Sequence, residues 1–183
     1  MKPHLSVASV HGRFQPLHLE HMEYITKAFT RTSFLYIGIT QYERANLQSV
    51  PGASRHRTDV DSNPLSFFER LTLIGLALDE IGVAKDTYAV VPFPIEKPDQ
   101  LGDFLPVDVP VLTTWVEEWN QTKIELLQRN GYTVEVLFNR DPKTIAGSDI
   151  RACIAKDDDS WKSLVPAATV GYLESLDLPS RLI

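Results

Sequence analysis

Two histidines three residues apart, His18 and His21, follow a loop that contains Gly12, Arg13 and Pro16. Residues three apart on a helix lie on one face, and the first turn of a helix presents free N–H groups and the positive end of the helix dipole. Two imidazoles there, beside an arginine and a glycine that lets the backbone approach a ligand, make a compact site for phosphate oxygens. Protonated imidazoles would stabilise the charge that develops when a nucleophile attacks an α-phosphate.

Two other interpretations of these histidines stay open on the residues alone. His18 and His21 also fit an ordinary solvent-facing helix surface. Together with His11 they could indicate zinc, but such sites usually need a third or fourth ligand, and no cysteine lies near them. We therefore predict a phosphate site and no protein-bound metal.

The chain alternates short apolar runs with amphipathic stretches. The expected strands are residues 5–10, 33–40, 87–93, 107–114 and 132–138. The expected helices are residues 17–30, 63–81, 116–130 and 148–156, with a helical tail over 159–176 interrupted at Pro166. Asn63 is the expected N-cap of the second helix with Pro64 in its first position, and Ser148 is the expected N-cap of the fourth.

This alternation predicts an α/β fold, a mostly parallel sheet with helices on both faces. Ligands of such sheets bind beyond the carboxyl ends of the strands, near the point where the strand order reverses. The loops that follow Val10, Thr40, Phe93, Thr114 and Phe138 are therefore the places to look for a site. A single domain over residues 1–183 is expected, with the helical tail at about 159–183.

Composition narrows the class of partner. The 183 residues include 18 Lys and Arg against 24 Asp and Glu, a formal net charge of −6. Nonspecific binding to nucleic acid or to an anionic membrane requires an excess of basic residues. Neither partner is therefore expected. Cys153 is the single cysteine, which excludes an internal disulfide. No apolar run approaches the ~18 residues of a membrane span, and the first ten residues do not read as a signal peptide, so a cytoplasmic setting is expected.

Residues 12–21 read Gly-Arg-Phe-Gln-Pro-Leu-His-Leu-Glu-His. This segment resembles the phosphate-binding signature of the nucleotidylyltransferase superfamily, Gly-Arg-Phe-x-Pro-x-His-x-Gly-His. The glutamine before the proline is most similar to nicotinamide mononucleotide adenylyltransferases of the archaeal type. The resemblance implies the Rossmann-like nucleotidylyltransferase fold, in agreement with the alternation of strands and helices.

Three later segments support the resemblance and occur in the same order as in that family. Residues 145–151, Ile-Ala-Gly-Ser-Asp-Ile-Arg, are similar to its Ile-Ser-Gly-Thr-x-Ile-Arg. Residues 63–70, Asn-Pro-Leu-Ser-Phe-Phe-Glu-Arg, are similar to its Asn-Pro-Phe-Thr-x-x-Glu-Arg. Residues 161–166 are similar to a stretch near its C-terminus. The matches therefore span most of the chain.

The resemblance implies roles for particular residues. His18 and His21 would stabilise the reacting α-phosphate, and Arg151 would clamp the outgoing pyrophosphate. The implied nucleotide-binding residues are Gly12, Arg13, Phe14, Ser148 and Ile150. Weaker candidates on the acceptor side are Gln41, Arg70, Phe104 and Trp115, where Arg70 fits a surface ion pair equally well. Mg²⁺ would bridge the phosphates.

The implied partners are a nucleoside triphosphate, ATP by default, and a phosphorylated small-molecule acceptor, and a homo-oligomer is possible. The default acceptor is nicotinamide mononucleotide, which would give NAD. One alternative is a cytidylyltransferase, or another nucleotidylyltransferase, that acts on a small phosphate or phosphonate. Another alternative is a non-catalytic nucleotide-binding module.

The sequence departs from the family pattern at two places. Glu20 replaces the glycine between the two histidines, and its carboxylate would repel a triphosphate unless it turns away or binds a metal ion. On the acceptor side, residues 94–104 lack the tryptophan of the family's Asn-Ser-x-Trp, and Thr-Thr-Trp at 113–115 replaces a turn of small residues. These departures favour a small phosphate or phosphonate acceptor, whereas the Gly-Arg-Phe-Gln-Pro spelling favours nicotinamide mononucleotide.

Overall fold

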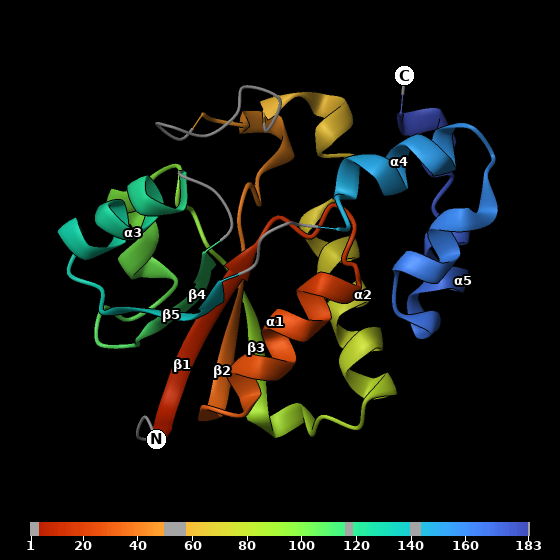
Figure 1. Cartoon of the computed structure of the whole chain (residues 1–183). Helices are drawn as coiled ribbons and strands as arrows, with labels where there is room; N and C mark the ends of the chain where they lie inside the picture. The colour runs from red at the N-terminus through yellow and green to blue at the C-terminus, as the bar shows by residue number, and fades with distance from the viewer. Residues whose placement is uncertain (1–3, 50–57, 116–118, 140–143, 183) are drawn as a thin grey trace.

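The computed structural model describes residues 4–49, 58–115, 119–139 and 144–182 (Figure 1). The strands are β1 (Leu5–Gly12), β2 (Thr32–Ile39), β3 (Tyr88–Pro92), β4 (Val111–Trp115) and β5 (Val134–Asn139). The α-helices are α1 (Leu19–Phe29), α2 (Phe67–Glu80), α3 (Trp119–Arg129), α4 (Gly147–Ala155) and α5 (Ala167–Ser175). Except for β4, the strands lie close to the predicted ranges, because each contains a run of mostly apolar residues.

All five strands belong to one parallel sheet in the order β3-β2-β1-β4-β5. The chain winds outward from β1 to β3 and then returns to place β4 on the other side of β1. The order therefore reverses between β1 and β4, and the predicted Rossmann-like α/β fold is confirmed. In Figure 1, α1 and α2 lie on one side of the sheet and α3 lies on the other.

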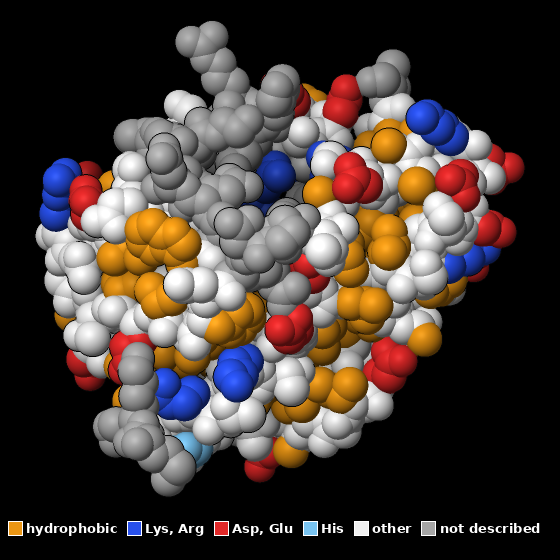
Figure 2. Space-filling view, viewed as in Figure 1, with side chains coloured by type: hydrophobic (Ala, Val, Ile, Leu, Met, Phe, Trp, Pro, Cys, Tyr) orange, Lys and Arg blue, Asp and Glu red, His pale blue; other side chains and the backbone are white. Residues whose placement is uncertain are grey.

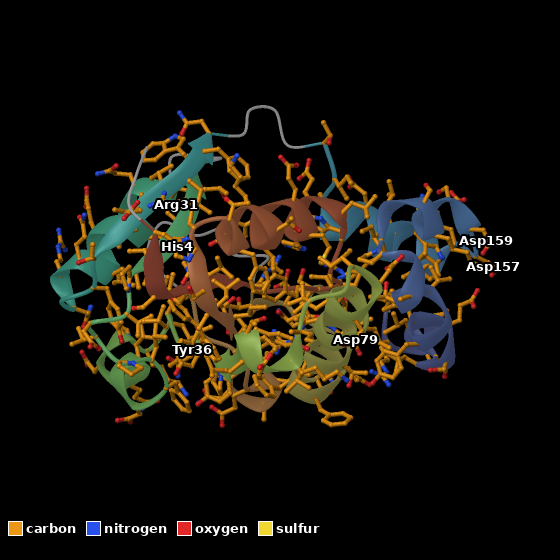
Figure 3. The ribbon with its side chains drawn as sticks, turned by 90° about the horizontal axis from the view of Figure 1, so that it is seen from below. His4, Arg31, Tyr36, Asp79, Asp157 and Asp159 are labelled. Atoms are coloured by element: carbon orange, nitrogen blue, oxygen red, sulfur yellow. The ribbon has the colours of Figure 1, made fainter. Side chains whose placement is uncertain are left out.

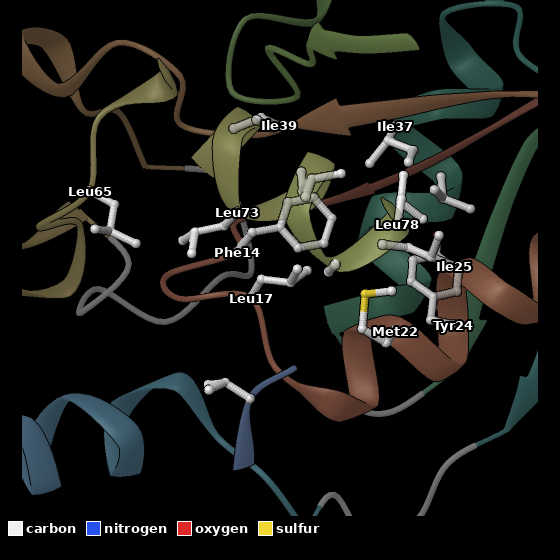
Figure 4. Close-up of a cluster of buried hydrophobic side chains, with 14 of the residues drawn as sticks. Phe14, Leu17, Met22, Tyr24, Ile25, Ile37, Ile39, Leu65, Leu73 and Leu78 are labelled. Carbon is white, nitrogen blue, oxygen red and sulfur yellow. The ribbon is translucent and has the colours of Figure 1, made fainter. Parts of the chain in front are cut away.

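Two hydrophobic clusters cover the two faces of the sheet. The larger one packs strand residues such as Ala8 and Ile37 against α1, α2, α4 and α5 (Figure 4). The smaller one joins Val111 and Phe93 to Leu127 of α3. Because successive strand residues point to opposite faces, β1 directs Val10 into the larger cluster and His11 toward the smaller one.

Polar side chains make contacts between segments at the amino ends of the strands (Figure 3). Arg31, just before β2, forms an ion pair of 3.3 Å with Glu135 of β5. The His4 ring and the Ser33 hydroxyl are 3.0 Å apart. These contacts fix the amino ends of the strands and leave the carboxyl ends to the loops that carry the motifs.

The start of α2 differs from the prediction. The N-cap is Ser66, and Asn63 instead ends a short 3₁₀ helix, Val60–Ser62. The Ser66 hydroxyl accepts from the Glu69 N–H at 3.2 Å, and the Glu69 carboxylate accepts from the Ser66 N–H at 2.7 Å. This reciprocal pair satisfies two N–H groups at the start of the helix, which the Asn63–Pro64 alternative would not do.

Two further boundaries are corrected. β4 begins at Val111 and not at 107, because the preceding residues form a turn in which the Val109 N–H donates to the Pro106 carbonyl at 3.0 Å. The N-cap of α4 is Ala146, so Ser148 already lies inside the helix. The expected helix at 116–130 is described from Trp119 onward, and residues 116–118 lie outside the described residues.

The C-terminal tail follows the prediction. A 3₁₀ helix, Asp159–Leu164, and α5 lie on either side of Pro166, which is the N-cap of α5. Asp157 and Asp159 lie at the outer end of this part of the molecule (Figure 3). Among the described residues, no helix has the length and apolar character that crossing a membrane requires.

Candidate active site

The two segments predicted to hold phosphate lie against each other at the carboxyl end of β1. The Arg151 guanidinium on α4 donates to the Gln15 carbonyl in the loop after β1 at 2.6 Å, and to the Ser62 hydroxyl at 3.5 Å. A Cβ added at Gly147 would lie 2.7 Å from the same Gln15 carbonyl. The absence of a side chain at this position therefore lets the start of α4 approach the loop.

His18 and His21 form a stacked pair at the start of α1. His18 is the N-cap and its side chain is only 1% exposed, and the ring centroids of the two histidines are 3.6 Å apart. The His18 N–H donates to Nδ1 of His21 at 3.3 Å. A neutral His21 therefore carries its proton on Nε2, the atom that would donate to a phosphate oxygen.

Gly12 and Phe14 set the path of the loop. Phe14 has a left-handed backbone with φ of 52°, and its side chain is fully buried. A Cβ at Gly12 would lie 2.9 Å from the Phe14 ring. The ring also meets His21 edge-on, with centroids 5.0 Å apart. Any contact of Phe14 with a nucleotide must therefore come from its backbone, while its side chain fixes the position of His21.

Glu20 joins the N-terminus of α1 to the segment that leads into α4. Its Oε1 accepts from the Thr144 N–H at 2.9 Å, from the Thr144 hydroxyl at 2.8 Å and from the Ile145 N–H at 3.3 Å. The carboxylate thus turns toward the segment that leads into α4. We call this set of contacts the Glu20 brace.

The remaining residues predicted to bind the nucleotide, all on α4, differ in how far they are exposed. Arg151 is half-buried, and burial lowers the pKa of its guanidinium, against the opposing effects of Asp149 and Asp61. Ser148 is exposed, with its hydroxyl 3.4 Å from the Asp149 carboxylate. Ile150 is fully buried in the larger cluster, so its side chain packs α4 and offers no surface to a nucleotide.

Arg70 lies in the interior of the protein and not at its surface. Its side chain is fully buried and donates to the backbone carbonyls of Ser66, Arg13, Thr40 and Gln41 at 2.8–3.2 Å. Burial, with the nearby arginines Arg13 and Arg44, lowers its pKa to about 9, so it stays protonated at neutral pH. The surface ion pair that the sequence also allowed for Arg70 is wrong, because the buried guanidinium holds the loops after β1 and β2; its contact with the acceptor stays a prediction.

The other acceptor-side candidates lie in two places. Gln41 has a left-handed backbone with φ of 49°, and its side chain both donates to and accepts from the backbone of Gln48. The Phe104 ring lies 5.6 Å from that of Tyr42, so the loops after β2 and β3 meet. Trp115 is half-buried at the end of β4, beside Asn139 of β5.

One buried polar contact near the ends of β1 and β4, between Lys123 and Thr113, was not predicted from the sequence. Lys123 of α3 donates to the Thr113 hydroxyl at 2.9 Å. The His11 ring stacks on Phe93, with centroids 4.3 Å apart and planes within 2°. The spacing of residues could have indicated that Lys123 is buried, because it lies four residues before the buried Leu127 and therefore on the same face of α3.

Among the described residues, no group of three His, Cys, Asp or Glu side chains has an arrangement that could hold a metal ion. His11 lies on Phe93 in the smaller cluster, whereas His18 caps α1, which packs on the larger cluster. The three histidines of the zinc alternative are therefore divided between two faces of the sheet.

The parallel sheet and the two helix N-termini that meet at its carboxyl edge define a Rossmann-like α/β protein with a compact basic site. No protein-family model matches the chain. Phosphonoformate cytidylyltransferase of Streptomyces viridochromogenes is 32% identical over 94% of this chain and 93% of its own length. Nicotinamide-nucleotide adenylyltransferase of Methanolobus tindarius is 28% identical over 93% of this chain and 89% of its own.

A solved structure has a similar fold. It is a bifunctional NMN adenylyltransferase/ADP ribose pyrophosphatase of Francisella tularensis complexed with AMP and a manganese ion, with a TM-score of 0.70 and 16% identity. The match covers 97% of this chain and 52% of that one, so the chain spans about half the length of the bifunctional protein. Given the two relatives and this fold, the chain belongs to the nucleotidylyltransferases.

Proposed function

We propose that this nucleotidylyltransferase moves a cytidylyl group from CTP to a small phosphonate or phosphate. An oxygen of the acceptor attacks the α-phosphorus, the bond from that phosphorus to the α–β bridging oxygen breaks, and pyrophosphate leaves with the bond's electron pair. The observation that carries the proposal is that Arg151 of α4 binds the Gln15 carbonyl in the loop that leads to the stacked His18–His21 pair.

The roles of the residues follow from their geometry. His21 presents Nε2 as a donor, because its Nδ1 accepts from the His18 backbone. His18, stacked on it, completes a pair of imidazoles at the positive end of α1. Arg151 supplies a permanent positive charge for the β- and γ-phosphates. Positioning and charge stabilisation account for the rate, and no protein nucleophile is needed.

Magnesium enters this proposal as part of the nucleotide substrate. Mg²⁺ usually keeps several waters and binds substrate phosphates together with at most one or two carboxylates. That coordination fits the described residues, which contain no cluster of three metal-ligating side chains. The solved neighbour with AMP and a manganese ion supports a divalent cation beside the nucleotide.

Two observations support a small acceptor. The relative at 32% identity is named for phosphonoformate, and the segment between β3 and β4 contains no tryptophan that could cover a nicotinamide ring. The second candidate is transfer from ATP to nicotinamide mononucleotide. It is favoured by the archaeal adenylyltransferases, at 23–28% identity, and by the Gly-Arg-Phe-Gln-Pro spelling of the first motif.

The test is pyrophosphate release with Mg²⁺ from ATP, CTP, GTP and UTP. Each nucleotide is paired with nicotinamide mononucleotide, nicotinate mononucleotide, phosphonoformate, methylphosphonate and glycerol phosphate. Release from CTP with a small phosphonate or phosphate is the expected result. Release only from ATP with a pyridine mononucleotide would establish the second candidate. Tight nucleotide binding without release from any pair would indicate the binding module and contradict catalysis.

A further inference from the structure

One buried histidine takes no part in the transfer described above. His11 is the last residue but one of β1 and directly precedes Gly12, and its side chain is 8% exposed. Neither nitrogen of its ring has a hydrogen-bond partner among the described residues. Most buried polar groups in proteins are hydrogen-bonded, so an imidazole with two unsatisfied nitrogens beside the phosphate loop is expected to bond to a ligand.

The ring of His11 has a fixed orientation. His11 pairs with Gly38 of β2, where an added Cβ would lie 2.6 Å from the Phe93 side chain. The glycine therefore leaves room for Phe93, whose ring lies flat against that of His11, with centroids 4.3 Å apart and planes within 2°. The backbone N–H of His11 donates to the Tyr24 hydroxyl at 3.4 Å. An imidazole held in this way loses little conformational entropy when it binds a ligand.

The imidazole of His11 is neutral at pH 7. Burial, with a smaller contribution from the charge of Lys123, holds its pKa well below the ordinary value. A neutral imidazole has one N–H donor and one acceptor nitrogen. An ionised phosphonate or phosphate presents acceptor oxygens to the protein, so the N–H of His11 is the group that can bind it.

The geometry of the transfer places the acceptor on the face of the sheet that His11 faces. In the proposed transfer pyrophosphate leaves toward Arg151 of α4, and α4 packs on the larger cluster with α1 and α2 (Figure 1). The attacking and leaving oxygens lie roughly in line, on opposite sides of the α-phosphorus. The acceptor therefore approaches from the α3 face, where the His11 ring stacks on Phe93 of the smaller cluster. Figure 2, drawn from the same side, shows a basic side chain recessed at this edge of the sheet.

A neutral donor has a chemical advantage at this position. It holds an oxygen of the acceptor without placing a full positive charge beside it. The attacking oxygen then keeps the electron density that a protonated imidazole or a guanidinium would withdraw. A positively charged group is more useful beside the leaving pyrophosphate, where negative charge increases during the transfer.

We propose that His11 is an acceptor-binding residue, whose imidazole N–H donates to an oxygen of the acceptor's phosphonate or phosphate that does not attack. This inference rests on the proposed function and deepens it, because it assigns a residue to the anionic group of the acceptor. The contact directs the attacking oxygen toward the α-phosphorus. It places recognition of the acceptor on the α3 face of β1 and recognition of the nucleotide on the α1 face.

The experiment measures binding and turnover separately. Calorimetry gives the Kd of methylphosphonate and of phosphonoformate in the presence of a CTP analogue with a non-cleavable α–β bridge, and the Kd of the analogue alone. His11→Phe removes both nitrogens and keeps an aromatic ring on Phe93, and His11→Gln keeps an N–H donor. The matched control is His4→Phe, which makes the same change at an exposed histidine beside the amino end of β1.

His11→Phe is expected to weaken both phosphonates by the same factor, because they share the group that His11 binds. The factor should be about 10- to 100-fold, the usual value of a hydrogen bond to a charged group, while the Kd of the CTP analogue changes by less than about twofold. His11→Gln should recover part of this loss, and His4→Phe should change none of the three constants. If circular dichroism shows that His11→Phe does not fold, Phe93→Leu removes the ring that orients His11 and should weaken both phosphonates several-fold.

The opposite results would overturn the assignment. Unchanged binding of both phosphonates in His11→Phe would exclude the contact. Equal weakening of the phosphonates and of the CTP analogue would show that His11 only supports the fold of the phosphate loop.

The two proposals can fail independently. Pyrophosphate release from CTP with methylphosphonate, at a KM that His11→Phe does not change, would keep the proposed function and remove the inference. Selective loss of phosphonate binding in His11→Phe, with no release from any nucleotide in the wild type, would support the contact and contradict the transfer. Nicotinamide mononucleotide also carries a phosphate, so His11→Phe should weaken it by the same factor if it proves to be the acceptor.

Discussion

Two parts of the carboxyl edge of the sheet are held together in different ways. The donor side comprises the segments predicted to bind the nucleotide, and the acceptor side comprises the loops predicted to bind the acceptor. On the donor side, charged side chains reach backbone atoms of distant segments, as Arg151 does at Gln15 and Glu20 does at Thr144. On the acceptor side, the contact between the loops after β2 and β3 joins side chain to side chain, at Tyr42 and Phe104. Backbone anchors fix a geometry that any nucleotide needs, whereas side-chain contacts can be exchanged to change the acceptor. The comparison predicts that damage on the donor side lowers turnover with every acceptor.

The largest effect is expected from His18→Ala. Loss of one transition-state donor typically costs about 100- to 1,000-fold in kcat, and the stacked partner His21 would also lose its support. Turnover with CTP or ATP should fall by that factor with every acceptor, while circular dichroism shows an intact fold. Unchanged turnover in His18→Ala, or in the parallel variant His21→Ala, would remove these residues from the mechanism.

A smaller effect is expected from Glu20→Ala, which removes the Glu20 brace. Without the carboxylate, the Thr144 and Ile145 N–H groups lose their acceptor and the segment leading into α4 is less well fixed. The KM for the nucleotide should rise about tenfold, since each charge-assisted hydrogen bond contributes roughly 1.5–3 kcal/mol and water replaces part of it. The KM for the acceptor should change less than twofold.

The exposed Glu23 on the same helix gives the control, because Glu23→Ala removes an equal charge without touching the brace. A fall in the nucleotide KM of Glu20→Ala would show that the carboxylate acts mainly by repelling the triphosphate.

Gly38→Ala tests the packing of Phe93 against β2. The new Cβ would lie 2.6 Å from Phe93, so the ring that carries His11 must shift. Overpacking of this kind lowers the free energy of unfolding by roughly 1–3 kcal/mol, measured by urea denaturation. Gly75→Ala in α2 is the matched control: no atom lies within 4 Å of its Cβ, and stability should rise by about 0.4–1 kcal/mol. Equal effects of the two substitutions would contradict the packing argument.

The smallest effect concerns pH. The pKa of His11 is lowered in the folded protein, so below its ordinary value of about 6.5 the unfolded chain binds a proton that the folded chain does not. Stability therefore falls as the pH drops below about 6.5, by at most about 1.4 kcal/mol per pH unit from this group. His11→Phe should lose less stability than the wild type between pH 7.5 and 5.5, as measured by thermal unfolding. Equal losses would exclude His11 as a source of this dependence.

The sequence predicted the parallel sheet better than it predicted the boundaries of single elements. The runs of β1 and β2 are recognisable because strands in the middle of a sheet are buried on both faces, which favours continuous apolar residues. The start of α2 was misplaced because Asn63 and Ser66 are both good N-caps, and the choice depended on Glu69. Neither the burial of Arg70 nor the pairing of Lys123 with Thr113 could be predicted, since each depends on which distant segments meet.

The contacts of Arg70 have a consequence for how this protein can diversify. Among the described residues, the guanidinium donates to main-chain carbonyls, of which those of Arg13, Thr40 and Gln41 lie in the loops after β1 and β2, and every amino acid supplies the same carbonyl. The side chains at positions 13 and 40 can therefore be replaced without loss of the hydrogen bonds that Arg70 makes to these loops. One buried cation thus fixes the backbone of these loops while leaving some of their side chains free to vary. Variants with a new preference for the acceptor can therefore evolve, or be selected in the laboratory, without loss of the loop conformation.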